Sequence, residues 1–251
     1  MKYSFLLPYW KRESFKSTLI SFLHHYGSRS DYEIVIAEDI TNVEDPQHHQ
    51  KLLNLIDEFK GRLNLIHCVD EKKSYNSARK YNVAFKNSSG QFLIVSNPEN
   101  FHEENILAGL DDEFGKNPNA YVICSCKAVY FNNQVIDKYE DYKPNCRFWQ
   151  WYQHSMINNR MLHFCTALSR ENFIKIGGFD ERYCDGIAYE DDSFLKRVQF
   201  GGLDLVLRDD LVSMHIEHDR TYLHTNQDLY RINQNLWIRQ LTTNDFFEKF
   251  V

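Results

Sequence analysis

The chain of 251 residues lacks three features that would place it in whole classes of protein. It has no excess of positive charge: its formal net charge is −6, which argues against a nucleic-acid-binding protein because phosphate binding needs a basic face. It has no apolar run near the ~20 residues that span a bilayer. Its six cysteines show no paired metal-ligand spacing, and we expect them to be reduced, mostly buried thiols.

The first residues also lack the pattern of a signal peptide. The apolar run in MKYSFLLPYWKR is short, and Pro8 and Lys11 interrupt it. A cytoplasmic protein is therefore expected, with peripheral association at a membrane surface left open. No glycine follows the first predicted strand in FLLPYWKRES. A nucleotidyltransferase should carry a glycine-rich phosphate loop at this point, so we rank that class of enzyme last among the functions considered.

The chain does have an ordinary globular composition, with 43% hydrophobic and 25% charged residues, and it is rich in aromatic residues at 15%. Its first half alternates strand and helix patterns. Strands are predicted at residues 3–7, 32–37, 63–67 and 91–96, and helices at residues 13–26, 47–59, 75–87 and 103–115. Strands joined by helices predict an α/β fold with a mostly parallel sheet covered on both faces.

The second half is less regular. Strands are predicted at residues 120–131, 161–169, 203–207 and 211–215, and helices at residues 170–176, 191–200 and 225–241. Residues 138–160 are aromatic and polar without a clear period, which predicts a loop. An α/β half followed by a mixed α+β half predicts one composite domain.

The most informative stretch is IGGFDERYCDGIAYEDDSFLKR, at residues 176–197. A Gly-Gly turn leads to Glu190, Asp191 and Asp192, and a helix pattern follows at once. The positive end of a helix favours ionised carboxylates in its first turn, and an ionised carboxylate at a pocket rim is a good general base. Acidic residues are also common at solvated helix starts, and this stretch alone favours that interpretation.

Polar residues follow three of the predicted strands, at positions 8–12, 38–39 and 97–100. In open α/β sheets ligands bind beyond the carboxyl ends of the strands, so these residues are expected to meet in one crevice. Asp39 is a candidate to accept hydrogen bonds from a base or a ribose. An exposed turn residue is an equally good interpretation of Asp39.

Cations and histidines supply the other candidates. Arg79 is better placed to face a phosphate near a helix N-terminus than the lysines at 72–73, for which surface solvation is preferred. His215 and His218 follow a strand and are candidate ligands for a divalent metal, with Glu99 supplying a hard oxygen. With eleven histidines in the chain, accidental pairs are common, and the residues alone favour that interpretation.

The order of these motifs resembles the inverting glycosyltransferases of family 2, which have the GT-A fold. The resemblance covers residues 2–218. It is carried by FLLPYWKR, VIAEDI, SYNSARKYNVAFKNSSGQFLIVS, NPE, GGFDE, EDDSFLKR and the histidines that follow. GGFDE followed at this distance by ED-x-x-hydrophobic-x-x-Arg is a fairly specific signal, whereas each piece alone is weak.

The resemblance implies a nucleotide-diphospho-sugar donor, UDP-linked by family frequency, a glycan or other hydroxyl acceptor, and Mn²⁺ or Mg²⁺. It implies an inverting single displacement. It divides the single domain into a nucleotide-binding half (1–118), a metal and acceptor half (119–224) and a C-terminal helix (225–251). The resemblance implies Asp191 as the general base, with Glu190 beside it, and a nucleotide site formed by Pro8, Tyr9, Asp39, Asn76 and Arg79. It implies Asn97 and Glu99 at the diphosphate, and Glu99 and His215, with His218 as the near alternative, at the metal. More weakly, it implies Trp151 and Asp192 at the acceptor.

One departure from the family pattern sets up a competing hypothesis. Asn97 stands where the metal motif has its first aspartate, and a neutral amide is a weaker ligand for these cations. The alternative is therefore a catalytically inactive nucleotide-sugar-binding protein with a degraded metal motif. Among the aromatic residues at 148–152, Trp149 is expected to anchor a loop to the core, and for Trp151 an acceptor platform and such an anchor both remain open.

Overall fold

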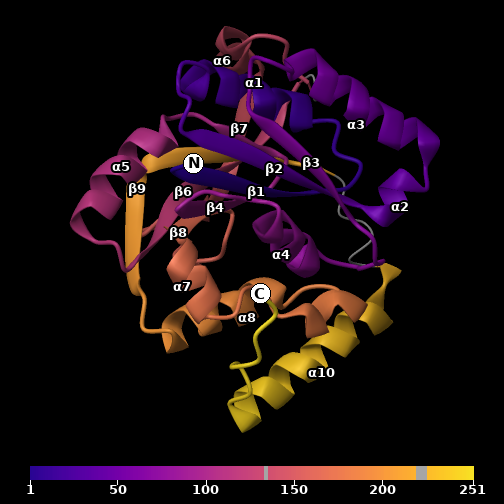
Figure 1. The fold of residues 1–251 in the computed structure, drawn as a ribbon, viewed down its shortest axis with the longest axis vertical. Helices are drawn as coiled ribbons and strands as arrows, with labels where there is room; N and C mark the ends of the chain where they lie inside the picture. The colour runs from indigo at the N-terminus through magenta and orange to yellow at the C-terminus, as the bar shows by residue number, and fades with distance from the viewer. Residues whose placement is uncertain (133–134, 219–224) are drawn as a thin grey trace.

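The computed structural model describes residues 1–132, 135–218 and 225–251, which form one sheet with helices on both faces (Figure 1). The strand order is β3-β2-β1-β4-β8-β6-β9-β5, and β7 pairs with β6. The strands are β1 (Tyr3–Tyr9), β2 (Tyr32–Asp39), β3 (Leu65–Asp70), β4 (Phe92–Ser96), β5 (Asn100–His102), β6 (Ala120–Phe131), β7 (Cys146–Gln153), β8 (Cys165–Ser169) and β9 (Asp204–Ile216). The helices are α1 (Phe15–Tyr26), α2 (Ile40–Val43), α3 (Pro46–Phe59), α4 (Ala78–Lys86), α5 (Ile106–Lys116), α6 (Tyr142–Asn145), α7 (Arg170–Lys175), α8 (Glu190–Phe200) and α10 (Gln227–Thr243), with short 3₁₀ turns η1 (Tyr139–Asp141) and η2 (Glu181–Asp185).

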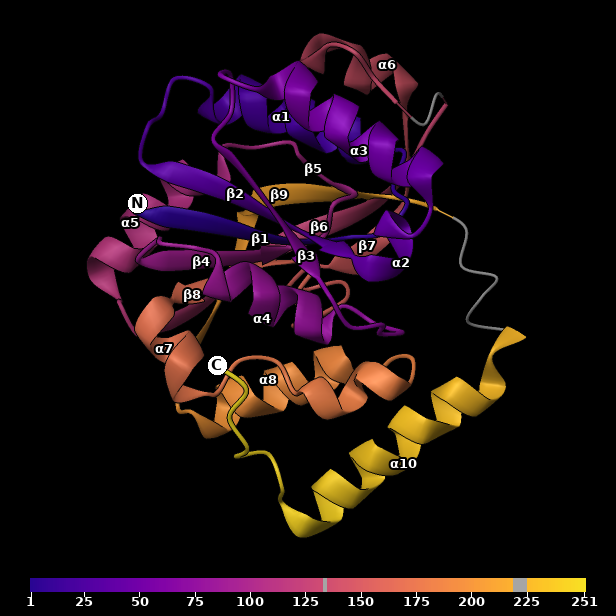
Figure 2. The same ribbon diagram turned by 45° about the vertical axis from the view of Figure 1, so that its right-hand side comes forward.

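The first half confirms the predicted parallel sheet, because β1 pairs in parallel with both β2 and β4, and β2 with β3. Alternate side chains of these buried strands point to opposite faces. On β1, Phe5 and Leu7 pack in the core beneath α1 and α3, while Leu6 packs in the core beneath α4, α7 and α8. Figure 2 shows these two sets of helices on either side of the sheet. Two apolar layers therefore fix the sheet between them.

The loop predicted for residues 138–160 is wrong. Strand β7 lies in this segment and pairs antiparallel with β6, with shifts in register next to Lys127 and Val129. Half of the residues of β7 are exposed, and its buried side chains come only at its end, at Tyr152 and Gln153. A strand with so little buried surface shows no apolar alternation, so its sequence carries no period-2 signal.

The two short strands predicted at residues 203–207 and 211–215 are one strand, β9. Its pairing with β6 jumps from Arg208 opposite Cys124 to Val212 opposite Ser125, so residues 209–211 bulge out of register. The polar bulge residues Asp209 and Asp210 interrupt the apolar pattern, which explains the apparent break. The metal and acceptor half, implied at 119–224, includes residues 219–224, which lie outside the described residues.

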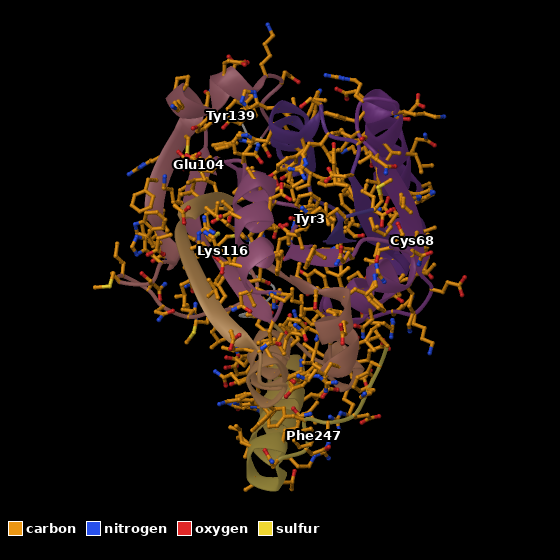
Figure 3. All side chains as sticks on the ribbon, turned by 60° about the vertical axis from the view of Figure 1, so that its left-hand side comes forward. Tyr3, Cys68, Glu104, Lys116, Tyr139 and Phe247 are labelled. Atoms are coloured by element: carbon orange, nitrogen blue, oxygen red, sulfur yellow. The ribbon has the colours of Figure 1, made fainter. Side chains whose placement is uncertain are left out.

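Helix α10 lies beyond α8, on the side away from the sheet (Figure 2). In Figure 3, Phe247 marks this end of the molecule, and Tyr139 lies at the opposite end. None of the helices in the described ranges is long and apolar enough to cross a membrane. All six cysteines carry free thiols.

A buried arginine joins the GGFDE segment to α8. The Arg197 side chain is fully buried, and its guanidinium donates to the carbonyl oxygens of Ile176 (3.1 Å) and Gly177 (3.3 Å). It also donates to the carbonyl oxygen of Glu248 and lies 3.8 Å from the Asp180 carboxylate. A buried charge needs such partners, so Arg197 holds three chain segments together.

The two glycines of this segment are required by the same junction. Gly177 and Gly178 have φ of 80° and 69°, a region that residues with a Cβ rarely adopt. A Cβ on Gly178 would lie 2.7 Å from Oδ1 of Asn82. The Asn82 amide donates to the Phe179 carbonyl oxygen and accepts from the Phe179 N–H, both at 2.9 Å. Helix α4 is thereby tied to the segment that leads to α8.

We expect the Arg197→Met variant to be strongly destabilised. Methionine keeps an unbranched apolar chain but removes every donor, leaving Asp180 and three carbonyl groups with fewer partners. Removing one partner of a buried charge pair costs roughly 3–5 kcal/mol, and the expected loss is about 3 kcal/mol because Arg182 still pairs with Asp180. Urea titration followed by circular dichroism measures the change.

The matched control is Arg231→Met, because the Arg231 side chain is 70% exposed. An exposed ion pair contributes little, so this variant should change the free energy of unfolding by less than about 0.5 kcal/mol. Equal losses in the two variants would contradict a structural role for the Arg197 junction.

Candidate active site

A cavity of about 720 Å³ opens at the carboxyl ends of β1, β2 and β4, where an α/β sheet is expected to bind its ligands. It brings together the acidic start of α8 and the Asn97-Pro98-Glu99 turn, which lie nearly a hundred residues apart in the sequence. Another hollow, of about 660 Å³, lies where β2 and β3 begin and is lined by Tyr32 and Leu65. That end of the strands is the wrong one for ligand binding in this kind of sheet.

The cavity gathers most of the predicted site residues. Those that line it are Pro8, Asp39, Asn76, Asn97, Glu99, Glu190, Asp191, His215 and His218. The predicted residues outside its lining are Tyr9, Arg79, Trp151 and Asp192. Trp10 and Arg12, from the strand end at positions 8–12 that was expected to meet the crevice, also line it. Residues that line it but were not singled out from the sequence include Lys80 and His163.

The local surroundings of the residues outside the cavity lining explain their positions. Tyr9 is 5% exposed and packs against Phe15 in the core. Trp151 lies on β7, with the Lys127 ammonium 5.5 Å from its ring centre. Asp192, half-buried in the first turn of α8, is the next residue after Asp191 but does not reach the cavity wall.

A cluster of one carboxylate and two imidazoles forms one wall. Oε1 of Glu99 lies 3.3 Å from Nε2 of His215 and 3.2 Å from Nε2 of His218. The other carboxylate oxygen accepts from Nε of Arg12 at 3.2 Å. Although burial of Glu99 opposes ionisation, Arg12 and the two imidazoles hold its pKa well below the usual range. Glu99 is therefore a buried, ionised carboxylate.

These three side chains fit a divalent cation. One ligand atom from each of Glu99, His215 and His218 can be chosen so that all lie within 4.8 Å of one another. The set combines a carboxylate oxygen with two imidazole nitrogens, and both kinds of atom are ligands of divalent metal ions in proteins. Asn97 lines the same cavity, but its Oδ1 already accepts from the Tyr81 hydroxyl at 2.7 Å.

Lys80 lines the cavity beside Asp39, whereas Arg79, the candidate from the sequence, does not. The Lys80 ammonium donates to Asp39 (2.6 Å), Ser74 (2.8 Å) and the Asn76 carbonyl oxygen (2.7 Å). Arg79, one position earlier on α4, instead pairs with Asp70 at 2.8 Å. Lys80 therefore fixes the loop that lines the cavity, and Arg79 fixes the end of β3.

Asp39 is a buried cap rather than an exposed turn residue. It is 2% exposed, and Oδ1 accepts from the backbone N–H of Thr41 at 2.9 Å, which caps α2. Burial alone would raise its pKa, but the Lys80 ammonium and the Thr41 hydrogen bonds outweigh burial and lower it. An ionised carboxylate has further lone pairs, so Asp39 can still accept a hydrogen bond from a ligand.

The acidic start of α8 differs from expectation in its charge. All three carboxylates lie in the first turn, as predicted. However, Oε2 of Glu190 is buried without a hydrogen-bond partner, and burial together with repulsion from Asp191 raises the pKa of Glu190 to about 8. Burial and Asp191 also raise the pKa of Asp192. The expectation that the helix terminus keeps all three ionised is therefore wrong for Glu190.

His163 is a cavity residue that the sequence did not indicate. Its Nε2 lies 3.2 Å from Oδ1 of Asp191, while its Nδ1 is buried without a partner. The rings of Tyr81, Phe179 and Phe194 surround it at 5.2, 4.9 and 5.9 Å. Burial lowers the pKa of His163, so a neutral imidazole lies against the Asp191 carboxylate.

The comparisons with solved structures identify the fold. The chain superposes on S. aureus TarS 1-349 with a TM-score of 0.67 and 14% sequence identity, covering 92% of this chain and 63% of that one. This chain has a GT-A glycosyltransferase fold. The complex of the same TarS fragment with UDP-GlcNAc gives a TM-score of 0.66 at 15% identity, covering 92% of this chain and 64% of that one.

A second solved structure and a family model agree with this fold. The mannosyltransferase PcManGT from Pyrobaculum calidifontis, in complex with GDP-Man and Mn²⁺, gives a TM-score of 0.60 at 13% identity, covering 88% of this chain and 58% of that one. The chain thus spans less than two thirds of these proteins. A family model described as the N-terminal domain of galactosyltransferase matches residues 157–224. No curated protein sequence matches the chain.

The charge state of Glu190 gives a pH-dependent stability. Its pKa is about 8 in the folded state against 4.5 ordinarily, so between these values the folded state binds more protons than the unfolded state. The stability from neutral Glu190 is therefore fully present below about pH 4.5 and is lost as the pH rises towards 8. We expect Glu190→Gln to show a smaller fall in Tm than the wild type between about pH 5 and pH 8.

Asp185→Asn serves as the control, because Asp185 is an exposed carboxylate in the same loop. This variant should keep the wild-type dependence of Tm on pH. If Glu190→Gln showed the wild-type dependence as well, Glu190 would not be protonated in the folded protein.

Proposed function

We propose that this chain is an inverting glycosyltransferase that moves a sugar from a nucleotide-diphospho-sugar to a hydroxyl acceptor. The observation that carries the proposal is the shared cavity, in which the α8 carboxylates face the Glu99, His215 and His218 cluster. A UDP-linked donor is supported by the TarS complex with UDP-GlcNAc, which has a similar fold. The GDP-Man complex of PcManGT makes a guanosine donor the competing choice.

Asp191 is the general base in this proposal. The carboxylate takes a proton from the acceptor hydroxyl, and the oxygen attacks the anomeric carbon opposite the leaving diphosphate. The His163 imidazole lies 3.2 Å from one oxygen of the same carboxylate and limits its movement. Glu190, held neutral, adds no negative charge beside Asp191. A single displacement of this kind inverts the anomeric centre and needs no covalent intermediate.

The opposite wall carries the leaving group. Glu99, His215 and His218 would hold a divalent cation, and we propose Mn²⁺ because PcManGT, which has a similar fold, was solved with Mn²⁺. Such a cation offsets the charge that grows on the diphosphate. Arg12 adds a fixed positive charge beside Glu99. Lys80 and Asp39 shape the nucleotide side.

An inactive nucleotide-sugar-binding protein is the second candidate, and Asn97 favours it. Purified protein mixed with UDP-GlcNAc, UDP-glucose, UDP-galactose and GDP-mannose separates the two functions through the nucleoside diphosphate that is released. Binding of UDP without turnover of any donor, with or without Mn²⁺, would establish the inactive protein.

We expect Asp191→Asn to fold normally, to bind donor and to lose transfer by a factor of roughly 10² or more, the usual effect of removing a general base. Transfer to free sugars or to water is followed by release of the nucleoside diphosphate, and the anomer of the product by NMR. Asp185→Asn, an exposed carboxylate five residues before Glu190, is the control and should keep full transfer. Near-normal transfer by Asp191→Asn would refute the assignment.

We expect Glu99→Gln to weaken Mn²⁺ binding by on the order of tenfold or more, because it removes the only charge among the three ligands but keeps their shape. Electron paramagnetic resonance of free Mn²⁺ during titration measures the affinity directly, without a substrate. The control is Glu104→Gln, an exposed residue labelled in Figure 3, which should leave the affinity unchanged. Equal affinities in Glu99→Gln and the wild type would exclude Glu99 as a ligand.

A further inference from the structure

Two residues directly before Glu190 hold a strained backbone conformation. Ala188 has φ of 66° and Tyr189 has φ of 68°, both in the left-handed region. For residues with a Cβ this region costs free energy, and it persists only where the surrounding structure holds it. Tyr189 is the cap residue of α8, so the strained turn sets the direction in which Glu190 and Asp191 enter the cavity.

Helix α10 makes the hydrogen bonds that hold this turn. Asn233 is fully buried, and its Nδ2 donates to the carbonyl oxygens of Ala188 (2.8 Å) and Tyr183 (3.0 Å). The Leu229 carbonyl oxygen on the same helix accepts from the backbone N–H of Ile187 at 3.2 Å. Three backbone groups of residues 183–188 are therefore bound to α10.

The Tyr189 side chain is fixed as well, and so is the close contact between Gly186 and α10. The Tyr189 hydroxyl lies 2.7 Å from the Tyr230 hydroxyl, and its ring stacks on Trp237 with the centres 6.2 Å apart. A Cβ on Gly186 would lie 2.4 Å from Oδ1 of Asn233, so only glycine permits so close an approach. The turn and the helix are built to fit each other.

The contact surface of α10 is polar, which favours a positioning role over simple coverage of α8. Its buried side chains are Asn233, Leu236 and Gln240, two of them amides. The Gln240 amide donates to Asp180 at 2.7 Å and accepts from the Tyr183 hydroxyl at 2.6 Å. Buried hydrogen bonds specify one geometry, whereas an apolar contact tolerates several.

We propose that α10 is a positioning element of the active site, in which Asn233 holds the strained Ala188–Tyr189 turn and so fixes Glu190 and Asp191 in the cavity. Leu229 of the same helix also lines the cavity, so one element supplies both a wall and the hold on the turn. The inference rests on the proposed transferase function for its effect on rate. Its structural part is open to a measurement that needs no activity.

The test compares Asn233→Ala with Asn235→Ala, the same substitution at an exposed position of the same helix. In Asn233→Ala we expect hydrogen exchange at residues 184–192 to become on the order of tenfold faster. We expect kcat to fall on the order of tenfold, with the donor KM within about twofold, because Asp39 and Lys80 lie on other elements. Asn235→Ala should match the wild type in all three.

The Ala188→Gly substitution tests whether Asn233 acts by holding the strained backbone. If Asn233 only stabilised the fold, relieving the strain at residue 188 would not restore kcat. Glycine adopts a positive φ without strain, so Ala188→Gly added to Asn233→Ala should restore a large part of the lost kcat. If Asn233→Ala does not fold, Tyr230→Phe replaces it, with smaller changes of the same sign expected and the same rescue by Ala188→Gly.

The outcomes separate the two proposals. Wild-type exchange and kcat in Asn233→Ala would overturn the positioning role, and so would faster exchange with unchanged kcat in an active enzyme. Failure of Ala188→Gly to restore activity would show that strain is not what Asn233 holds. Absence of transfer by the wild type would instead refute the proposed function, and the exchange data would still decide whether α10 holds the turn.

Discussion

The buried Arg197 guanidinium is the constraint on which the cavity depends. It binds the backbone of the GGFDE segment, the carboxylate of Asp180 and the carbonyl oxygen of Glu248, so it joins α8 to two other segments. Asn82 adds a link from that segment to α4, which packs on the sheet. Because the glycine at 178 admits no side chain beside Asn82, this junction has one geometry. The start of α8 thus faces the ends of β1 and β4.

Two similar carboxyl groups in the cavity have different charges, because the groups around them differ: Glu99 is ionised and Glu190 is neutral. Glu99 lies among Arg12, His215 and His218, and these donors keep it ionised despite its burial. Glu190 has no such donor at its buried oxygen and has Asp191 beside it, so it stays neutral to about pH 8. The same physical cause, burial, is compensated on one wall and left uncompensated on the other. In the proposed function, the neutral Glu190 adds no charge beside Asp191, and the ionised Glu99 lies on the wall of the leaving diphosphate.

The sequence predicted the first half of the fold because β1, β2 and β4 are buried on both faces and the helices between the strands carry apolar stripes. It failed where burial is partial, as at β7, or where a polar bulge interrupts a strand, as at residues 209–211 of β9. Arg79 was preferred from the sequence to the lysines at 72–73, but it lies outside the cavity lining, whereas Lys80, the next residue on α4, lines the cavity. The direction of a side chain on α4 depends on packing against β1 and β2, which the sequence does not show. His163 lies among aromatic rings that come from distant segments, so no local pattern marked it.

The motifs that carry the resemblance divide into those that build the site and those that would act in it. Gly177, Gly178 and Arg197 build the junction, whereas Asp191, which lies in the same matched range of residues 157–224, lines the cavity. In the proposed function the chemistry depends on Asp191 and the Glu99 cluster. At position 97 the Tyr81 hydroxyl donates to the side-chain oxygen of asparagine, a contact that an aspartate would also accept. Asparagine at this position therefore keeps the contact with Tyr81 and carries no negative charge. With Arg12 already beside Glu99, a cation held by His215 and His218 would meet a smaller negative charge, which favours binding that depends on the phosphates of the donor.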